Sequence, residues 1–370
     1  MLEVGLIGTG YGAEIQAQAL QVNRAFSLLG VASQDYKSSK RVKKEVGFRY
    51  AFSDWQELVR YRKTDIVLVA SPPQTHYEII YEALQHQKHV LTTAPFVLNV
   101  EQAEELSALA NEHEVMGVVD HHLNYLPARK YAINLIKSGK IGKLKSVNRI
   151  FRNSGGLDRN MSRSWKFQMQ NGGGAFWQYA SHDIDYLLRA VGGVNMIRYD
   201  GVQNISDRIN PEGFTEPVKC DDSGTVLLRF HNGAKATVNI DTTYPGKPVN
   251  EFVFHGEHGL LHLKNDNELF LYHQDGSRDR VAIPPSFQIT TIPGAAARSP
   301  FYMLSEAFAA AIYGQGKVSP TFDEAVHTQR AMNAALRSEE QDNWVEVGAD
   351  VITQVQTTAQ SGSEVHKIFE

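Results

Sequence analysis

The sequence predicts an α/β domain with a doubly wound parallel sheet, followed by an α+β domain with a large, mostly antiparallel open sheet. Residues 1 to about 120 alternate short apolar runs with segments of helical periodicity, the order expected of βαβ units. After Asn124, strand-like runs follow one another with few helices between them, as in an α+β domain. We therefore expect domains at 1–122 and 123–370, with a C-terminal segment able to pack back on the first.

In the first domain, apolar runs predict strands at 2–7, 28–32, 66–70, 89–91 and 115–119. Apolar residues spaced three to four apart predict helices at 14–22, 77–85 and 100–112. The loops after these strands should lie along one edge of the sheet, which is where open α/β sheets bind their ligands.

In the second domain, we expect a helix at 128–137 and strands at 145–153, 223–230, 234–242, 251–254, 259–263 and 268–272. The turn His231-Asn232-Gly233 is typical of a hairpin. Segments 207–222 and 284–300 are rich in proline, glycine and polar residues, and they predict long loops.

The turn after the first strand carries the clearest ligand motif. Gly8 permits the tight turn, Gly10 lets a pyrophosphate approach the backbone, and Ala13 lets the following helix pack on the strand. A second strand closes a βαβ unit of about thirty residues, as this Rossmann fingerprint requires. We predict that the start of the helix binds a dinucleotide pyrophosphate, through Gly8, Thr9, Gly10, Tyr11, Gly12 and Ala13.

The end of the second strand bears on which coenzyme is bound. An acidic residue there would bind the ribose hydroxyl of NAD and repel the extra phosphate of NADP. This chain has Ser33 and Gln34, with Lys37 soon after. A hydroxyl and nearby cations suit a phosphate, so we expect NAD(P) with NADP slightly favoured. Alternatively, this is an ordinary solvated helix start with Asp35 as its N-cap.

Composition limits the class of protein. The 370 residues are 42% hydrophobic and 21% charged, with a net charge of −4, which suits two globular domains. The absence of a strong basic run argues against nucleic acid as the partner, and no apolar run is long enough for a membrane span. A single cysteine, Cys220, and an N-terminus without an apolar leader predict a cytoplasmic protein.

Five motifs together resemble the Gfo/Idh/MocA family of NAD(P)-dependent oxidoreductases, and the resemblance covers nearly the whole chain. They are the turn at 8–13, Ser-Pro-Pro-Gln-Thr-His at 71–76, Lys-His-Val-Leu at 88–91, the triple glycine at 172–174, and Ser-His-Asp-Ile-Asp at 181–185. A further segment, 119–128, resembles a variant found in one branch. The resemblance implies a substrate among sugars, polyols and related carbonyl compounds, and it adds coenzyme contacts at Ser71, Pro72, Thr75, His76, Thr93, Ala94, Pro95 and His122.

The chain departs from the family at two catalytic positions. After the strand at 89–91 the family pattern is Glu-Lys-Pro, whose lysine reaches the nicotinamide ribose and the substrate oxygen, but this chain has Thr93-Ala94-Pro95. The family's aspartate and histidine, one helical turn apart, align with Gln178 and His182. A positioned acid or base contributes about 10² to 10⁴ in rate, so the loss of the lysine should weaken hydride transfer unless another group replaces it.

Candidate replacements lie near the triple glycine. His182 can exchange a proton with a substrate hydroxyl because its ordinary pKa lies near neutrality. Tyr179 and Lys166 could supply a hydroxyl or a cation, although a core aromatic and a surface charge are favoured over a catalytic role. The aromatic cluster around the glycines fits core packing better than a stacking floor for sugar.

His121 and His122 follow a strand at the predicted ligand edge. A coenzyme or substrate contact is expected of His122, and a metal site with His76 and Asp120 is the alternative. Adjacent residues on an extended chain point in opposite directions, so we expect no metal. His255, His258 and His262 are expected on the surface or at an interface.

Three functions fit these residues. The first is an NAD(P)-dependent oxidoreductase with His182 as its acid or base. The second is a regulatory protein that senses NAD(P) or a small molecule, because Ala94 and Gln178 remove the usual proton-transfer groups. The third is a redox-neutral reaction with bound NAD(P). An apolar sheet face would need a cover, which predicts a homodimer or homotetramer through the C-terminal sheet, with Val226, Leu228, Val238, Ile240, Phe252 and Phe254.

Overall fold

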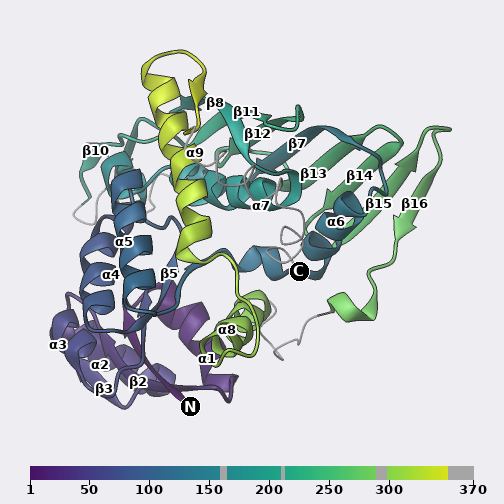
Figure 1. Ribbon diagram of the computed structural model, residues 1–370. Helices are drawn as coiled ribbons and strands as arrows, with labels where there is room; N and C mark the ends of the chain where they lie inside the picture. Colours follow the sequence, from purple (N-terminus) through teal and green to yellow (C-terminus); the bar gives the residue numbers. More distant parts are fainter. Residues whose placement is uncertain (159–164, 210–212, 289–297, 349–370) are drawn as a thin grey trace.

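The computed structural model describes residues 1–158, 165–209, 213–288 and 298–348. In these ranges the chain forms two layered parts, each built on its own large sheet. Figure 1 shows the first part at the bottom left and the second across the top and right. The predicted fold class is confirmed.

The first sheet is parallel throughout. Its described strands run in the order β3-β2-β1-β4-β5-β6, so the order reverses between β1 and β4, where a doubly wound sheet binds its ligand. The strands are β1 (Leu2–Ile7), β2 (Phe26–Ala32), β3 (Tyr50–Phe52), β4 (Ile66–Val69), β5 (His89–Thr93) and β6 (Gly117–Asp120).

Helices cover both faces of this sheet. Three of them begin at side chains that accept hydrogen bonds from the first turn, Asp35, Asp54 and Asn99, and such caps stabilise helix starts. The π-helical turn η1 (Gly12–Gln16) leads into α1 (Ala17–Val22), followed by α2 (Tyr36–Val42), α3 (Trp55–Arg60), α4 (His76–Gln85) and α5 (Val100–Glu112).

The second sheet is larger and mixed. In the described residues its order is β16-β15-β14-β13-β7-β12-β11-β8-β17, and the pairings are antiparallel except for β7 with β12. The strands are β7 (Leu144–Arg152), β8 (Val194–Val202), β11 (Ser223–Phe230), β12 (Lys235–Asp241), β13 (Val249–Gly256), β14 (Gly259–Lys264), β15 (Glu268–His273), β16 (Arg278–Val281) and β17 (Val345–Glu346). The hairpin at Gly233 joins β11 to β12.

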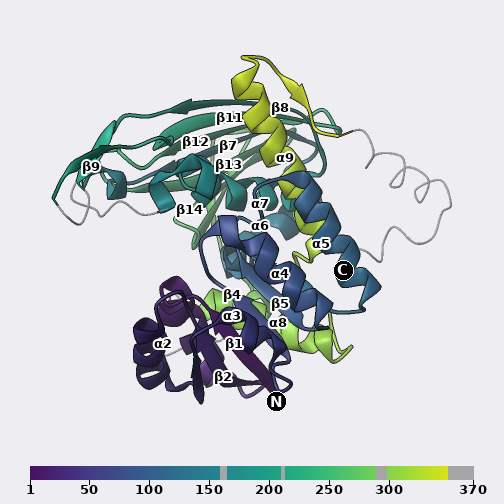
Figure 2. The ribbon, with the colours of Figure 1, turned by 90° about the vertical axis from the view of Figure 1, so that its left-hand side faces the viewer.

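One face of this sheet is covered by helices of the same chain. Figure 2 shows α6 (Pro127–Lys137) and α7 (Ser181–Val191) beneath it, with α9 (Phe322–Glu340) crossing β8. The apolar face that we expected a second subunit to cover is this inner face: Val226, Leu228, Val238, Ile240, Phe252 and Phe254 are all buried in the core against these helices. The expectation that these six residues need an external cover is therefore corrected, because sequence alternation cannot tell which face the helices occupy.

The predicted loop at 207–222 is also corrected in part. It contains a small hairpin of β9 (Asp207–Ile209) and β10 (Thr215–Pro217), too short and too polar to give a strand pattern. In the predicted loop at 284–300, residues 289–297 lie outside the described residues, and a turn of 3₁₀ helix, η9 (Pro285–Phe287), comes before them.

The C-terminal helices return to the first part. Phe301, Leu304 and Phe308 of α8 (Ser299–Ile312) are buried with Leu20 and Val118. Helix α9 begins with a capping box between Thr321 and Glu324 and packs between α5 and β8. These two helices connect the layers and fix the sheet edge that carries the glycine turn relative to α7.

Candidate active site

The glycine turn has the shape that a dinucleotide requires. A Cβ on Gly8 would lie 2.3 Å from the carbonyl oxygen of Ala70, and one on Gly12 would lie 2.5 Å from the Ala70 Cβ. A Cβ on Gly10 would meet nothing within 4 Å, so the space beside Gly10 is open. Gly8 and Gly12 are thus required for packing, whereas Gly10 leaves room for a pyrophosphate. Thr9 and Ala13 complete the turn, with Ala13 buried.

Asp120, at the end of β6, contacts side chains of two neighbouring segments through its carboxylate. Its carboxylate accepts from Gln16 Nε2 at 2.6 Å and contacts His122 Nδ1 at 2.7 Å. The Tyr11 ring stacks on His122, with centroids 6.4 Å apart. Burial pushes the pKa of Asp120 upward, but the His122 charge and these hydrogen bonds outweigh it, so the pKa lies below its ordinary value. Tyr11 and His122 thus flank the open side of the turn.

At the end of β2, the residues predicted to select the coenzyme stand near the surface. Ser33 is half-buried and donates to the carbonyl of Asp35, while Gln34 and Lys37 are exposed. The carboxylate of Asp35 accepts from the backbone of Lys37 and Ser38, so it is the N-cap of α2. The Ser38 hydroxyl also donates to it, and these hydrogen bonds hold the pKa of Asp35 below its ordinary value.

The loops after β4 and β5 are held together by His76. Its Nε2 lies 2.9 Å from the Ser71 carbonyl oxygen and its Nδ1 lies 3.0 Å from that of Phe96, and the residue is fully buried. Thr75 donates to the carbonyl of Pro72. In this position His76 shapes the loops rather than reaching the open edge. Next to it, Thr93 and Ala94 are half-buried and Pro95 is buried.

The segment that carries His182 starts at the triple glycine. Gly172 and Gly174 have positive φ, 82° and 96°, which L side chains rarely adopt. A π-helical turn, η8 (Phe176–Ala180), then leads into α7. The Gln178 amide donates to the carbonyls of Lys166 and Gly174. The expected carboxylate position is therefore occupied by an amide whose NH₂ group is used to hold the turn.

His182 meets His121 across the two parts of the molecule. Their Nδ1 atoms are 3.0 Å apart and their rings meet edge to face, with centroids 4.8 Å apart. His121 is only 2% exposed, whereas His182 is half-buried and lines a cavity of about 280 Å³. The predicted acid or base therefore faces a cavity, backed by a second imidazole.

The other residues that line this cavity are mostly polar or charged, and their charges balance. Arg129 forms a two-point ion pair with Asp266, at 2.7 and 3.1 Å, and Arg149 pairs with Asp183 at 2.8 Å. Arg129 Nη1 is buried and has no hydrogen-bond partner among the described residues. The complete lining is Leu123, Arg129, Arg149, Phe151, Gln178, Tyr179, His182, Asp183, Asn250 and Asp266.

Three charged residues of this cavity, Arg129, Arg149 and Asp266, were missed by sequence reasoning, although one of them left a detectable pattern. Val147, Arg149 and Phe151 alternate along β7, with Val147 and Arg149 both buried. An arginine on a buried apolar strand face must be paired, and it is paired here with Asp183. His121 was noted in the sequence, but nothing in its spacing connected it with His182.

Burial sets the protonation of the two histidines. It lowers the pKa of His182 well below its ordinary value, and the nearby His121 and His122 lower it further. Burial also lowers the pKa of His121, against the opposing charge of Asp185. Both rings are therefore neutral at neutral pH, and each has one nitrogen that can accept a proton.

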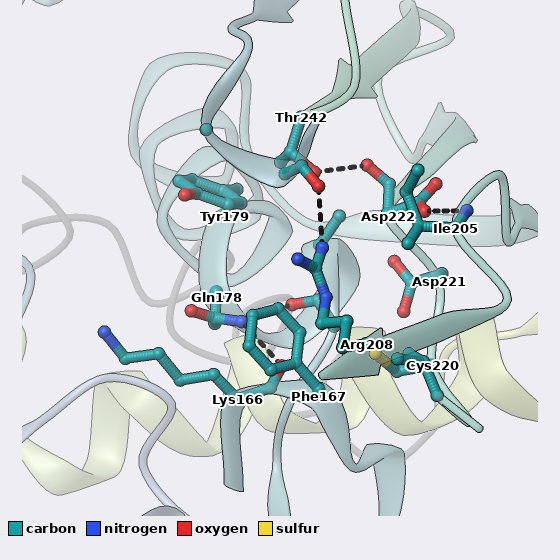
Figure 3. Close-up of a pocket in the computed structure, with 15 residues that line it drawn as sticks. Lys166, Phe167, Gln178, Tyr179, Ile205, Arg208, Cys220, Asp221, Asp222 and Thr242 are labelled. Atoms are coloured by element: carbon teal, nitrogen blue, oxygen red, sulfur yellow. Dashed lines mark hydrogen bonds between the residues drawn. The ribbon is translucent and has the colours of Figure 1, made fainter. Parts of the chain in front are cut away.

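The other two catalytic candidates differ in position. Tyr179 lines the His182 cavity and packs on Phe151, with ring centroids 4.9 Å apart, and burial raises its pKa. Lys166 is exposed and lines a second cavity of about 190 Å³ that does not include His182. Figure 3 shows its ammonium end pointing away from Arg208 and Asp221. Lys166 is thus less well placed than Tyr179 to replace the family lysine.

Two family models match this chain. One, an oxidoreductase family with an NAD-binding Rossmann fold, matches residues 2–121, and the GFO/IDH/MocA C-terminal domain matches residues 130–262. The chain belongs to the Gfo/Idh/MocA family of oxidoreductases. The family predicted from the motifs is confirmed, and an enzyme is favoured over a regulatory protein. No helix of the described residues is long and apolar enough to cross a membrane.

Several relatives share nearly the full length of this Gfo/Idh/MocA member. An oxidoreductase of Synechocystis is 26% identical, covering 94% of this chain and 96% of its own. Levoglucosan dehydrogenase of Pseudarthrobacter phenanthrenivorans is 24% identical, covering 94% and 98%. A solved levoglucosan dehydrogenase in complex with NADH and levoglucosan has a TM-score of 0.85 at 23% identity, covering 94% of this chain and 99% of its own. At that identity the structural likeness shows a common fold.

Proposed function

We propose that this protein is an NAD(P)-dependent dehydrogenase that oxidises a CH–OH group of an uncharged sugar, polyol or related cyclic hydroxy compound, or reduces the corresponding ketone. The observation that carries the proposal is a neutral imidazole, His182, facing a cavity between the coenzyme edge of the first sheet and the inner face of the second. Levoglucosan and myo-inositol dehydrogenases are among the relatives, and both names describe enzymes acting on polyhydroxylated rings.

His182 is the proposed acid and base. When bound, the oxidised nicotinamide coenzyme supplies the acceptor for the hydride that leaves the substrate carbon. The hydroxyl proton then needs a base, and a neutral imidazole with a low pKa remains unprotonated, so its lone pair is available. Because Ala94 has no ammonium group, the polarising role of the family lysine must come from hydrogen bonds in the cavity, and the candidate donor is Tyr179, which lines it.

The cavity charges favour an uncharged substrate. Two arginines and two aspartates cancel one another in pairs, so the net charge offered to a ligand is near zero. Sugar hydroxyls both donate and accept, which suits a lining that alternates guanidinium and carboxylate groups.

The coenzyme proposal keeps NADP slightly ahead of NAD. Ser33 and Lys37 stand at the end of β2, and the Asp35 carboxylate is already bound to two backbone amides of α2. A carboxylate used in this way is less able to bind the two ribose hydroxyls of NAD. Cations and a hydroxyl nearby suit the additional phosphate.

The compartment and the oligomeric state are proposed from the single cysteine and from the outer face of the second sheet. A single buried thiol, Cys220, fits a reducing compartment such as the cytoplasm. The outer face of the second sheet carries half-buried apolar side chains, including Leu227, Val253 and Phe270, with Thr237, Asn148 and His262 between them. We propose that a second copy of the chain covers this outer face in a homodimer or tetramer.

The decisive experiment combines coenzyme binding with turnover. Purified protein is titrated with NAD and NADP, then assayed for coenzyme reduction with a panel of sugars, anhydrosugars and polyols. We expect binding of NADP at least as tight as that of NAD, and a drop of about 10² to 10⁴ in kcat for His182→Ala with coenzyme affinity retained. Binding without turnover of any substrate would instead favour the sensing alternative. A rate unchanged in His182→Ala would remove this histidine from the mechanism.

A further inference from the structure

The contact between His121 and His182 joins two residues that lie 61 positions apart in the sequence. His121 directly follows β6 of the first sheet and His182 stands in the first turn of α7. Their Nδ1 atoms are 3.0 Å apart, a normal hydrogen-bond distance. The His182 ring reaches the cavity, whereas His121 is buried behind it.

A hydrogen bond between two like nitrogens fixes how the pair holds its protons. One Nδ1 must carry a proton and the other must offer a lone pair. The two rings therefore cannot both be imidazolium, because each Nδ1 would then carry a proton. When His182 is the donor, its Nε2 keeps a lone pair for a proton from the cavity side, and His121 holds its own proton on Nε2.

The charges around His182 disfavour a cation on that ring. Besides burial, His121, His122 and Arg129 lower its pKa, and only Asp120 acts in the opposite direction among the main contributors. A proton on His182 is therefore disfavoured, which favours its transfer to a neighbouring acceptor.

The surroundings of His121 are more favourable to a cation. Burial, Arg189 and His122 lower its pKa, but the carboxylates of Asp185 and Asp120 raise it. Asp185 is itself ionised, since Arg189 and its hydrogen bonds hold its pKa at about 2 in spite of burial. The charges of two carboxylates thus favour a proton on His121, the inner imidazole of the pair.

We propose that His121 is the proton acceptor behind His182, so that the two imidazoles act as one acid–base unit. The inference rests on the proposed function. During oxidation the substrate O–H bond breaks and the His182 Nε2–H bond forms, while the Nδ1–H bond of His182 breaks and the Nδ1–H bond of His121 forms. The hydride goes to the oxidised nicotinamide coenzyme. Reduction of the ketone runs the same transfers in reverse.

In this arrangement the positive charge that develops during oxidation comes to rest on His121, away from the substrate. The pair thereby takes over proton handling at a site where Ala94 stands in place of the family lysine. His121 does not touch the substrate; it is a positioning residue that acts through His182.

Two substitutions separate proton acceptance from ring positioning. Asparagine at 121 can place an amide oxygen near the Nδ1 position and still accept a hydrogen bond from His182, but it cannot take a proton. For His121→Asn we expect kcat to fall about 10²-fold with KM and coenzyme affinity within about threefold of the wild type. His121→Phe should lose at least as much, and the exposed His86 serves as control in His86→Asn. If His121→Asn keeps kcat within about threefold of the wild type, the proton-acceptor role is overturned and only positioning remains.

A second readout needs no substrate. With ¹⁵N-labelled histidine in the full-length protein, imidazole nitrogen shifts are followed as the pH is lowered. We expect the first proton taken up by the pair to appear on the His121 ring while His182 stays neutral, and we expect His182 to change tautomer in His121→Phe. Protonation of His182 first, or independent titration of the two rings, would overturn the inference. Because this measurement is made without turnover, it still decides the matter if the proposed dehydrogenase activity itself fails.

Discussion

At the scale of a single residue, Asp221 holds the turn before α7 through a hydrogen bond, and burial of its carboxyl disfavours the ionised form. One of its carboxylate oxygens accepts from the Phe176 backbone amide at 2.6 Å, and the other is buried with no hydrogen-bond partner among the described residues. Gly174 must lack a side chain here, since its Cβ would lie 2.2 Å from that second oxygen. Burial raises the pKa of Asp221 to about 7, because ionising a buried and incompletely hydrogen-bonded carboxyl is unfavourable.

This raised pKa gives stability a defined pH dependence. The folded protein holds the Asp221 proton more tightly than the unfolded chain, whose aspartate pKa is near 3.8. The stabilisation is therefore present at low pH and is lost as pH rises from about 4 to about 7. Relative to Asp221→Asn, the free energy of unfolding of the wild type should fall by about 2 to 3 kcal/mol between pH 5 and 8. Denaturant titrations of both proteins measure this, and parallel pH profiles would contradict it.

At the scale of elements, two π-helical turns stand at the site, η1 after the glycine turn and η8 before α7. Such turns are rare and are often found at functional sites. In η8 the extra residue shifts Gln178 relative to His182, yet both line the same cavity. Gln178 and His182, four residues apart, thus lie along one side of this segment, although the segment between them is not a regular α-helix.

Two substitutions in the glycine turn test coenzyme binding separately from folding. Because a Cβ on Gly10 meets nothing in the protein, Gly10→Val should fold with a Tm close to that of the wild type, while its side chain fills the space left for the pyrophosphate. We expect coenzyme affinity to fall at least tenfold, measured by calorimetry. Gly12→Val is the matched comparison: its Cβ clashes with Ala70 and Leu6, so it should lower Tm. Undiminished coenzyme binding by Gly10→Val would rule out this turn as the pyrophosphate site.

Elements with a strong local pattern were predicted well from the sequence. The periodic helix at 100–112 and the alternating strand at 223–230 have the predicted bounds, and the hairpin at Gly233 is present. The three-residue strand β3 was missed because so short a segment has no period. The contact of His121 with His182, and the network of Arg129 with Asp266, depend on how separate elements pack, and no local pattern contains that information.

At the scale of the whole molecule, the two faces of the second sheet have different roles. The inner face packs on α6, α7 and α9 and carries the cavity. On the outer face, cross-strand neighbours form a row of side chains across four strands. Leu227 pairs with Thr237, Thr237 with Asn148, and Asn148 with Val253. Leu227, Thr237 and Val253 are half-buried and Asn148 is exposed, and Figure 2 shows the helices α6 and α7 on the opposite side of the sheet.

An interface on the outer face can be broken without touching the site. In Leu227→Asp combined with Val253→Asp, two carboxylates would be desolvated at its centre, which is costly when they have no partner. We expect the wild type to be a dimer or larger by light scattering and the double variant to be a monomer that still binds coenzyme. The exposed Lys63 of the first domain provides the control in Lys63→Asp, which should leave the mass unchanged. A wild type that is monomeric at all concentrations tested, or a double variant that keeps the wild-type mass, would exclude this face as the subunit interface.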